Sequence, residues 1–142
     1  MIRIVRALAF TALFALGASA CDSASNATDC HVGDSCACSA AGTCSWTCVD
    51  AGCAFSASGM GAANLTCAKG GCSLTASGQG AANLSCAGGN CTATASGQGD
   101  VNLSCAGGGC SMTCGGQGAC NITSCPTCTC NETSITASCS VN

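Results

Sequence analysis

The stretch CSLTASGQGAANLSCAGGN, residues 72–90, is followed at once by CTATASGQGDVNLSCAGGG, residues 91–109, so the chain repeats nearly the same unit after 19 residues. A fixed period of this length is typical of solenoids, in which each unit packs against its neighbours. Apolar and polar residues alternate along SLTA and ANLSC in the first copy, which predicts two short, half-buried strands. The repeat therefore predicts two strands per unit, joined by two glycine-bearing turns.

From this pattern we predict an all-β, disulfide-rich β-solenoid of about five coils, with regular repeats at 48–124. The middle residues of the strands are the expected core: Phe55, Leu74, Ala93 and Met112 on one strand, and Trp46, Leu65, Leu84, Leu103 and Ile122 on the other. An antiparallel β-meander is the alternative. A single meander sheet would leave its apolar face uncovered, whereas strands folded face to face bury it.

The cysteines follow the same period. Pairs five residues apart predict the bridges Cys48–Cys53, Cys67–Cys72, Cys86–Cys91 and Cys105–Cys110. A second pair of positions carries cysteine only at the two ends of the array and small apolar residues between, which predicts Cys38–Cys44 and Cys114–Cys120. The five-residue step and elimination give Cys125–Cys130, Cys30–Cys36 and Cys128–Cys139. Cross-links between coils are the alternative.

The N-terminus, residues 1–20, has the parts of an export signal: basic MIRIVR, apolar ALAFTALFALGA, and Ala18 and Ala20 before Cys21. The end of this segment, ASAC, resembles a bacterial lipobox, although Ala18 stands where Leu is usual. The resemblance implies that Cys21 carries lipid and that membrane lipid is a partner. A tether at 21–29 and a cysteine-rich repeat domain at 30–142 would follow. Secretion into the medium, with Cys21 as one more disulfide cysteine, is the alternative localisation.

The number of cysteines fits lipidation. The chain has 19, so modification of Cys21 would leave an even number for pairing. Small exported domains with few large apolar residues use disulfides in place of a large core.

The charge of the chain argues against nucleic acid as a partner. Without residues 1–20, Lys69 is the only basic side chain, against six acidic residues. Binding to phosphates by counterion release needs several Lys or Arg residues. We therefore expect no nucleic-acid partner.

Residues suited to catalysis are few. His31 is the only histidine. Cation binding with its neighbours Asp29 and Asp34 is one interpretation, but a lone histidine beside a tether is more often a solvated loop residue. Nothing in the sequence places a serine and an acid beside His31, or two carboxylates as a glycosidase needs. We therefore expect no enzyme, no catalytic residues, no cofactor and no metal site.

The segment CPTCTC, residues 125–130, resembles two motifs. Its CxxC with Pro126 is similar to a thioredoxin-type redox site, and its CxxCxC is similar to a metallothionein cluster. A thioredoxin-type redox site needs a helix N-terminus to lower the thiol pKa, and no helix is predicted there. We expect a disulfide cap; a cysteine-rich metal-binding protein is a further alternative function.

Six Asn-x-Ser/Thr sequons occur, at Asn26, Asn64, Asn83, Asn102, Asn121 and Asn131. Four of them recur at the repeat period: Asn64, Asn83, Asn102 and Asn121. Side-chain amides stacked at one position of successive strands bond along the stack. We therefore predict an asparagine ladder rather than glycosylation sites.

The outward residues of the other strand form an expected grid of hydroxyl groups: Ser73, Thr75, Thr92, Thr94, Ser111 and Thr113. Over residues 53–124 this arrangement resembles the Thr-x-Thr face of disulfide-stapled β-solenoid antifreeze proteins from insects, in architecture and chemistry but not in repeat motif. Ala54 and Ser56 break the first rank. The resemblance implies ice binding as an alternative function, although small hydroxyl residues suit any exposed strand.

The whole chain resembles cysteine-rich repeat lipoproteins of the bacterial envelope. This resemblance implies export to the cell envelope more than any activity. The expected function is that of a non-enzymatic, disulfide-stabilised envelope lipoprotein with a structural or surface-binding role. Its expected partner, besides lipid, is an unidentified molecule at the cell surface or outside the cell.

Overall fold

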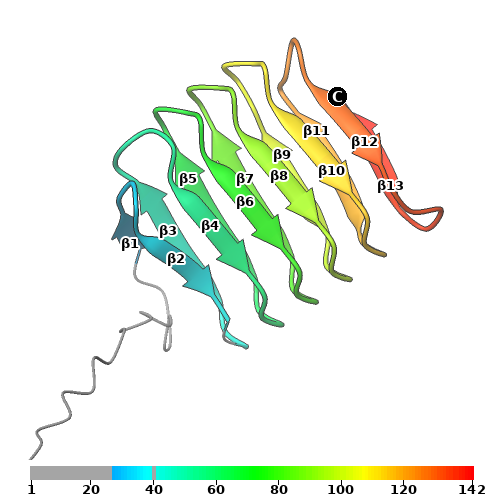
Figure 1. The fold of residues 1–142 in the computed structure, drawn as a ribbon, viewed down its shortest axis with the longest axis horizontal. Helices are drawn as coiled ribbons and strands as arrows, with labels where there is room; N and C mark the ends of the chain where they lie inside the picture. The colour runs from blue at the N-terminus through cyan, green and yellow to red at the C-terminus, as the bar shows by residue number, and fades with distance from the viewer. Residues whose placement is uncertain (1–26, 40) are drawn as a thin grey trace, which may run out of the picture.

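The computed structural model describes residues 27–39 and 41–142, which form two parallel β-sheets packed face to face (Figure 1). One sheet has seven strands: β1 (Ala27–Cys30), β3 (Cys44–Cys48), β5 (Ala63–Cys67), β7 (Ala82–Cys86), β9 (Val101–Ser104), β11 (Ala119–Thr123) and β13 (Ser138–Val141). The other has six: β2 (Ser35–Cys38), β4 (Ala54–Ala57), β6 (Ser73–Ala76), β8 (Thr92–Ala95), β10 (Ser111–Cys114) and β12 (Thr129–Glu132). Within these residues, no helix is long and apolar enough to cross a membrane.

The chain alternates between the two sheets, and each strand pairs in parallel with its equivalent one coil away. In the middle coils the register equals the sequence period, so that Leu74 pairs with Ala93 and Leu84 with Leu103. The predicted solenoid is therefore confirmed, and the meander alternative is excluded because its neighbouring strands would be antiparallel.

The solenoid has about six coils rather than five. The additional strands lie at both ends, where the sequence departs from the repeat but the register continues. At the N-terminal end Cys30 pairs with Cys48, and at the C-terminal end Ile122 pairs with Val141. Strand β1 includes residues 27–29, which we had assigned to the tether, because their backbone pairs with β3. The predicted signal peptide and Cys21 lie outside the described residues.

The core between the sheets is narrow and apolar except for the buried indole N–H of Trp46, which has no hydrogen-bond partner among the described residues. The predicted inward residues of both strands are all buried, with Leu103, Met112 and Ile122 at 0% exposure. No buried residue of the described part is polar or charged. Apart from Val101, the remaining buried side chains are cysteine and alanine, so each coil buries a small area and depends strongly on its covalent bridges.

Six of the predicted disulfides are present: Cys30–Cys36, Cys48–Cys53, Cys67–Cys72, Cys86–Cys91, Cys105–Cys110 and Cys114–Cys120. Each one closes a turn between consecutive strands. No cross-link between coils occurs among the bridges of the described residues 48–110.

The two C-terminal predictions, Cys125–Cys130 and Cys128–Cys139, are wrong. The bridges are Cys125–Cys128 and Cys130–Cys139. The five-residue step does not continue, because Cys130 pairs with Met112 and therefore occupies the middle of a strand instead of the end of a turn. Cys139 lies on the facing sheet, opposite Cys120 in register, and closes the last coil with Cys130.

The predicted Cys38–Cys44 bridge is also not formed, and Cys44 has a free, buried thiol. Both cysteines nevertheless occupy the predicted positions. The register leads from Cys38 through Ala57 and onward to Cys114, and likewise from Cys44 to Cys120. The segments that join the two pairs of positions differ in sequence, SAAGT in one and GGQGA in the other.

Candidate functional site

The predicted hydroxyl grid lies on the outer side of strands β6, β8 and β10, and we call it the hydroxyl face. Its members are Ser73, Thr75, Thr92, Thr94, Ser111 and Thr113. Ser73 and Ser111 flank Thr92 in the register, so that the first column is continuous across three coils. All six side chains are exposed or half-buried, and no charged residue occurs in the three strands.

The six hydroxyl groups have no hydrogen-bond partner among the described residues. Backbone groups of these strands are satisfied by the parallel ladder, so the hydroxyl groups are left for water or a ligand. The parallel register places neighbouring hydroxyl groups about 4.8 Å apart between coils. This face is therefore a neutral and regularly spaced set of donors and acceptors.

The hydroxyl face ends differently on its two sides. Toward the N-terminus Ala54 and Ser56 on β4 continue the columns, and Ala54 removes one hydroxyl group, as the sequence indicates. Toward the C-terminus Thr129 and Asn131 on β12 extend both columns and are exposed. The regular part thus has three ranks, with a fourth in which Asn replaces Thr.

The opposite sheet carries the asparagine ladder that the sequence predicts. Asn83 donates to Asn64, Asn102 to Asn83 and Asn121 to Asn102, each from Nδ2 to Oδ1 at 3.0 Å. The ladder ends at Ser140, whose hydroxyl donates to Asn121 Oδ1 at 2.7 Å. These amides bond mainly to one another, in contrast to the hydroxyl face.

A shallow groove lies beside this ladder. Its other side is a column of small hydroxyl residues, Thr66, Ser85, Ser104 and Thr123. Leu65 and Leu84 form part of its lining. The side chains around it are neutral, and they include no cysteine, histidine or carboxylate that would supply a nucleophile or a proton acceptor.

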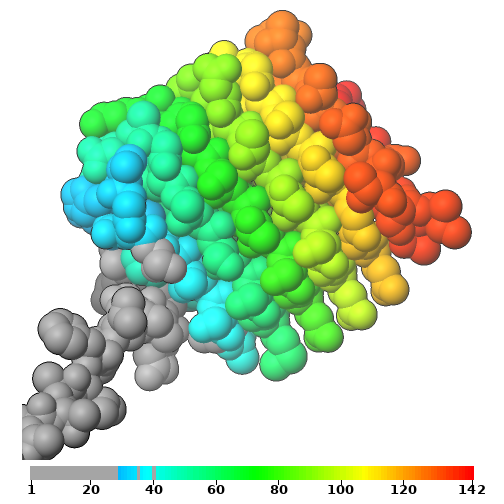
Figure 2. Space-filling model, viewed as in Figure 1, coloured from blue at the N-terminus to red at the C-terminus, as the bar shows by residue number. Residues whose placement is uncertain are grey.

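A second groove, not predicted from the sequence, follows the turns between β6 and β7 and their equivalents. It is lined by Gln79, Gln98 and Gln117, the glycines before them, and hydroxyl groups including Ser77, Ser96 and Ser134. In Figure 2 the coils are visible as parallel ridges, and these turns form one edge of them. The repeated SGQG motif is the sequence feature that indicates this groove, but from the motif we predict only a turn.

Several groups of three cysteines are close enough to bind one metal ion, for example Cys48, Cys67 and Cys72. In the structure these cysteines belong to disulfides. A disulfide sulfur is not the thiolate that zinc or copper prefers. In this oxidised form, the group therefore consists of one disulfide and one cysteine of the neighbouring disulfide.

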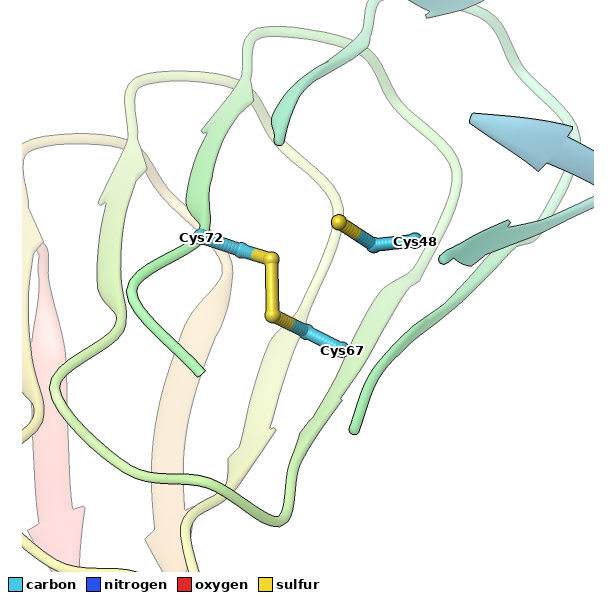
Figure 3. A group of neighbouring side chains, drawn as sticks. All are labelled: Cys48, Cys67 and Cys72. Atoms are coloured by element: carbon cyan, nitrogen blue, oxygen red, sulfur yellow. A yellow bond between two sulfur atoms is a disulfide. The ribbon is translucent and has the colours of Figure 1, made fainter. Parts of the chain in front are cut away.

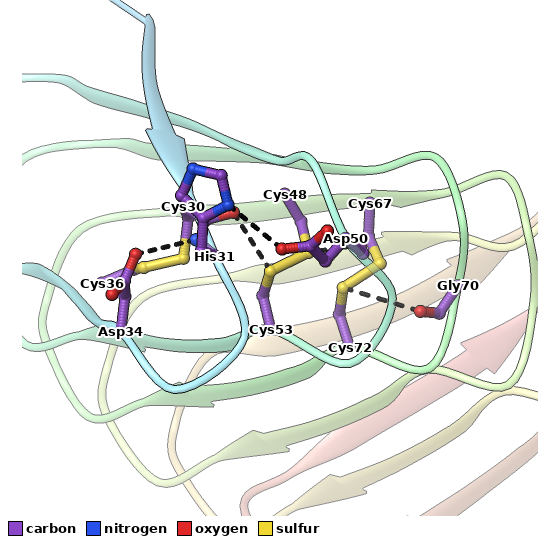
Figure 4. Close-up of a disulfide and its surroundings, with 10 residues drawn as sticks. All are labelled: Cys30, His31, Asp34, Cys36, Cys48, Asp50, Cys53, Cys67, Gly70 and Cys72. Atoms are coloured by element: carbon purple, nitrogen blue, oxygen red, sulfur yellow. Dashed lines mark hydrogen bonds and ion pairs between the residues drawn. A yellow bond between two sulfur atoms is a disulfide. The ribbon is translucent and has the colours of Figure 1, made fainter.

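His31 lies at the N-terminal end, beside the first cysteine turns (Figure 4). Its Nδ1 is 3.1 Å from Asp50 Oδ2, and its backbone N–H donates to Asp34 Oδ2 at 2.9 Å. The hydrogen bond with His31 lowers the pKa of Asp50 below its ordinary value of 3.8. Sequence reasoning named Asp29 and Asp34 but missed Asp50, which is one repeat away. The pair is exposed, and it links two coils at the surface.

No protein-family model, curated protein or solved structure matches the chain. A function is therefore inferred from the sequence and from the geometry of the described residues.

Proposed function

We propose that this protein is a non-enzymatic, disulfide-stabilised protein of the bacterial envelope, anchored by lipid at Cys21, with a structural or surface-binding role. The observation that carries the proposal is the hydroxyl face, which is neutral, regularly spaced and without hydrogen-bond partners among the described residues. Disulfides at every described coil of residues 48–110 hold this face rigid. A rigid face binds with a smaller loss of conformational entropy than a mobile one.

Envelope anchoring is tested by metabolic labelling with a fatty-acid analogue. We expect label on the unaltered protein and none on the Cys21→Ala variant. The Cys44→Ala variant is the matched control, because it also removes one cysteine but leaves the lipobox-like segment intact. Label retained by Cys21→Ala would exclude the proposed anchor.

Surface binding is tested with purified protein and isolated cell envelopes in a sedimentation assay. A Thr94→Lys variant places a charge in the centre of the hydroxyl face and is expected to reduce binding. Thr66→Lys is the control, since Thr66 is exposed on the opposite sheet. Equal binding by both variants would show that the hydroxyl face is not the contact surface.

Ice binding is the second candidate, and the paired columns of the hydroxyl face favour it. An ice-binding face needs hydroxyl groups in regular ranks, which the register of β6, β8 and β10 supplies. We expect thermal hysteresis from the purified Cys21→Ala protein and its loss in Cys21→Ala with Thr94→Lys. No hysteresis at high protein concentration would end this candidate.

A further inference from the structure

The cysteine turns form a column of sulfur atoms along one edge of the solenoid. In this sulfur column the bridges Cys48–Cys53, Cys67–Cys72, Cys86–Cys91, Cys105–Cys110 and Cys125–Cys128 follow one another. The first sulfur of each bridge lies within 4.8 Å of both sulfurs of the next. Figure 3 shows the side chain of Cys48 pointing toward the Cys67–Cys72 bridge.

The bridges of the sulfur column differ in exposure. The cysteines from Cys48 to Cys110 in this column are at most 2% exposed. Cys125 and Cys128, at the C-terminal end, are only partly buried. A thiol in solution therefore has access to the column mainly through its last bridge.

The last bridge is also held firmly against the one before it. Between its cysteines lie Pro126 and Thr127, and Gly109 N–H is 3.0 Å from both the carbonyl and the hydroxyl oxygen of Thr127. These bonds dock the short loop on the preceding turn. Both Cys125 and Cys128 sulfurs consequently lie within 4.8 Å of Cys105 Sγ.

We propose that Cys125–Cys128 is a thiol–disulfide exchange site, and that the sulfur column passes the exchange inward from coil to coil. The partner is a thiol reductant, either a small dithiol or an exposed protein dithiol. This inference is independent of the hydroxyl face and of the role proposed for it.

The exchange balances at every step. The external dithiol reduces Cys125–Cys128, leaving two thiols in the protein and becoming a disulfide itself. One of these thiols, as a thiolate, attacks Cys105 Sγ; the Cys105–Cys110 bond breaks, and the electron pair and a proton go to Cys110.

The second C-terminal thiolate then attacks its partner in the mixed disulfide. This attack restores Cys125–Cys128 and releases Cys105, which takes a proton. Two electrons and two protons have moved inward by one coil, and Cys105 now lies within 4.8 Å of Cys86 and Cys110.

A second contact between bridges serves as an internal comparison. Cys139 Sγ lies 3.6 Å from Cys114 Sγ, so the Cys130–Cys139 bridge touches the Cys114–Cys120 bridge. This route ends there, because Ala95 and Val101 occupy the equivalent positions of the next coil. Only the sulfur column continues into the molecule.

The test is timed reduction of the full oxidised protein with limiting dithiothreitol, followed by acid quenching, alkylation and peptide mass spectrometry. We expect alkylation first at Cys125 and Cys128, next at Cys105 and Cys110, and later at Cys86 and Cys91. Alkylation of Cys86 and Cys91 before Cys105 and Cys110, or of all bridges together, would overturn the proposal.

Two double variants distinguish transfer of the exchange from bridge to bridge, which we call the relay, from simple loosening of the last coil. In Cys125→Ser with Cys128→Ser, we expect alkylation of Cys105 to slow about tenfold or more, because burial shields the remaining bridges from external thiols. Cys130→Ser with Cys139→Ser removes the neighbouring bridge and leaves the sulfur column intact, so Cys105 should react at the unaltered rate. Equal rates at Cys105 in both double variants would contradict the relay.

Discussion

The solenoid has two edges, and they are held together in different ways. On the cysteine edge, the turns VDAG, AKGG, AGGN and AGGG are each closed by a buried bridge. On the glycine edge, the turns SGMG, SGQG, SGQG and GGQG have a bridge only at the last, Cys114–Cys120. The second set varies much less than the first.

Close stacking of backbone on backbone constrains the glycine edge. A Cβ added at Gly80 or Gly99 would overlap the carbonyl group of the glycine one coil earlier. Gln98 and Gln117 N–H groups donate to carbonyls of that same earlier coil at 3.0 and 2.9 Å. Backbone contact that only glycine permits therefore holds the coils together on this edge. The same contact occurs on the cysteine edge, at Gly70 and Gly88, where the bridges are added to it.

The largest effect is expected from a methyl group on the glycine edge. Gly99→Ala forces its Cβ into the Gly80 carbonyl, and we expect a loss of about 3 kcal/mol in the free energy of unfolding, at the upper end for overpacking. Gly52→Ala on the cysteine edge is the control. Its φ is +81° and the nearest atom to its Cβ is at 3.9 Å, so only a left-handed backbone cost of about 1 kcal/mol is expected. Equal losses in denaturant unfolding would contradict the distinction.

Removal of a bridge from the cysteine edge is expected to have the next largest effect. In Cys86→Ala with Cys91→Ala, the unfolded chain loses a short covalent loop, which costs about 2 kcal/mol of stability in the chain-entropy model. Denaturant unfolding of the oxidised double variant measures it. An unchanged midpoint would mean that stacking alone holds this edge as well.

A bridge added to the glycine edge should have the opposite sign. Ala76 and Ala82 occupy the positions of Cys114 and Cys120 two coils earlier and are buried. Ala76→Cys with Ala82→Cys is expected to add one disulfide and about 1–2 kcal/mol of stability. Intact mass with and without alkylation verifies the bond, and Ala76→Cys alone is the control. A bond without stabilisation would indicate that the glycine turns are already fully constrained.

The smallest effect is expected from an exposed contact of the cysteine edge. The hydrogen bond with His31 lowers the pKa of Asp50, so the contact stabilises the fold above the ordinary pKa and this contribution is lost as pH falls through the lowered value. Asp50→Asn should therefore melt slightly below the unaltered protein at pH 5.5. At pH 2.5 the difference in melting temperature should be smaller. A larger difference at low pH would reverse the sign of this linkage.

The sequence was sufficient for the regular part of the molecule because one rule applies throughout it. A period of 19 residues sets the register of β4 to β10, and that register then places Leu84, the cysteine turns and the asparagine ladder. Each middle coil is related to the next by the same translation along one axis. The period in the sequence is therefore enough to predict this part of the fold.

The ends could not be predicted in this way. Cys130 lies in a strand because the Cys125–Cys128 turn has two residues instead of four, which changes the pairing of two bridges. Residues 27–29 lack the sequence of the repeat, so the sequence predicts a tether there. Their backbone nevertheless pairs with β3, because backbone pairing does not depend on repeat identity. The groove lined by Gln79, Gln98 and Gln117 is formed by the stacking of four turns. Single positions in the sequence do not predict such a groove.

The common register of the middle coils also bears on how such a chain changes length. Residues 72–90 and 91–109 present nearly the same strands to the coil before and the coil after. A gene duplication that inserts one more unit between them would create only contacts that already exist, and would lengthen the solenoid by about 4.8 Å. Recombination between repeats therefore alters the reach of the protein in whole steps, while the two ends and the chemistry of each face stay the same.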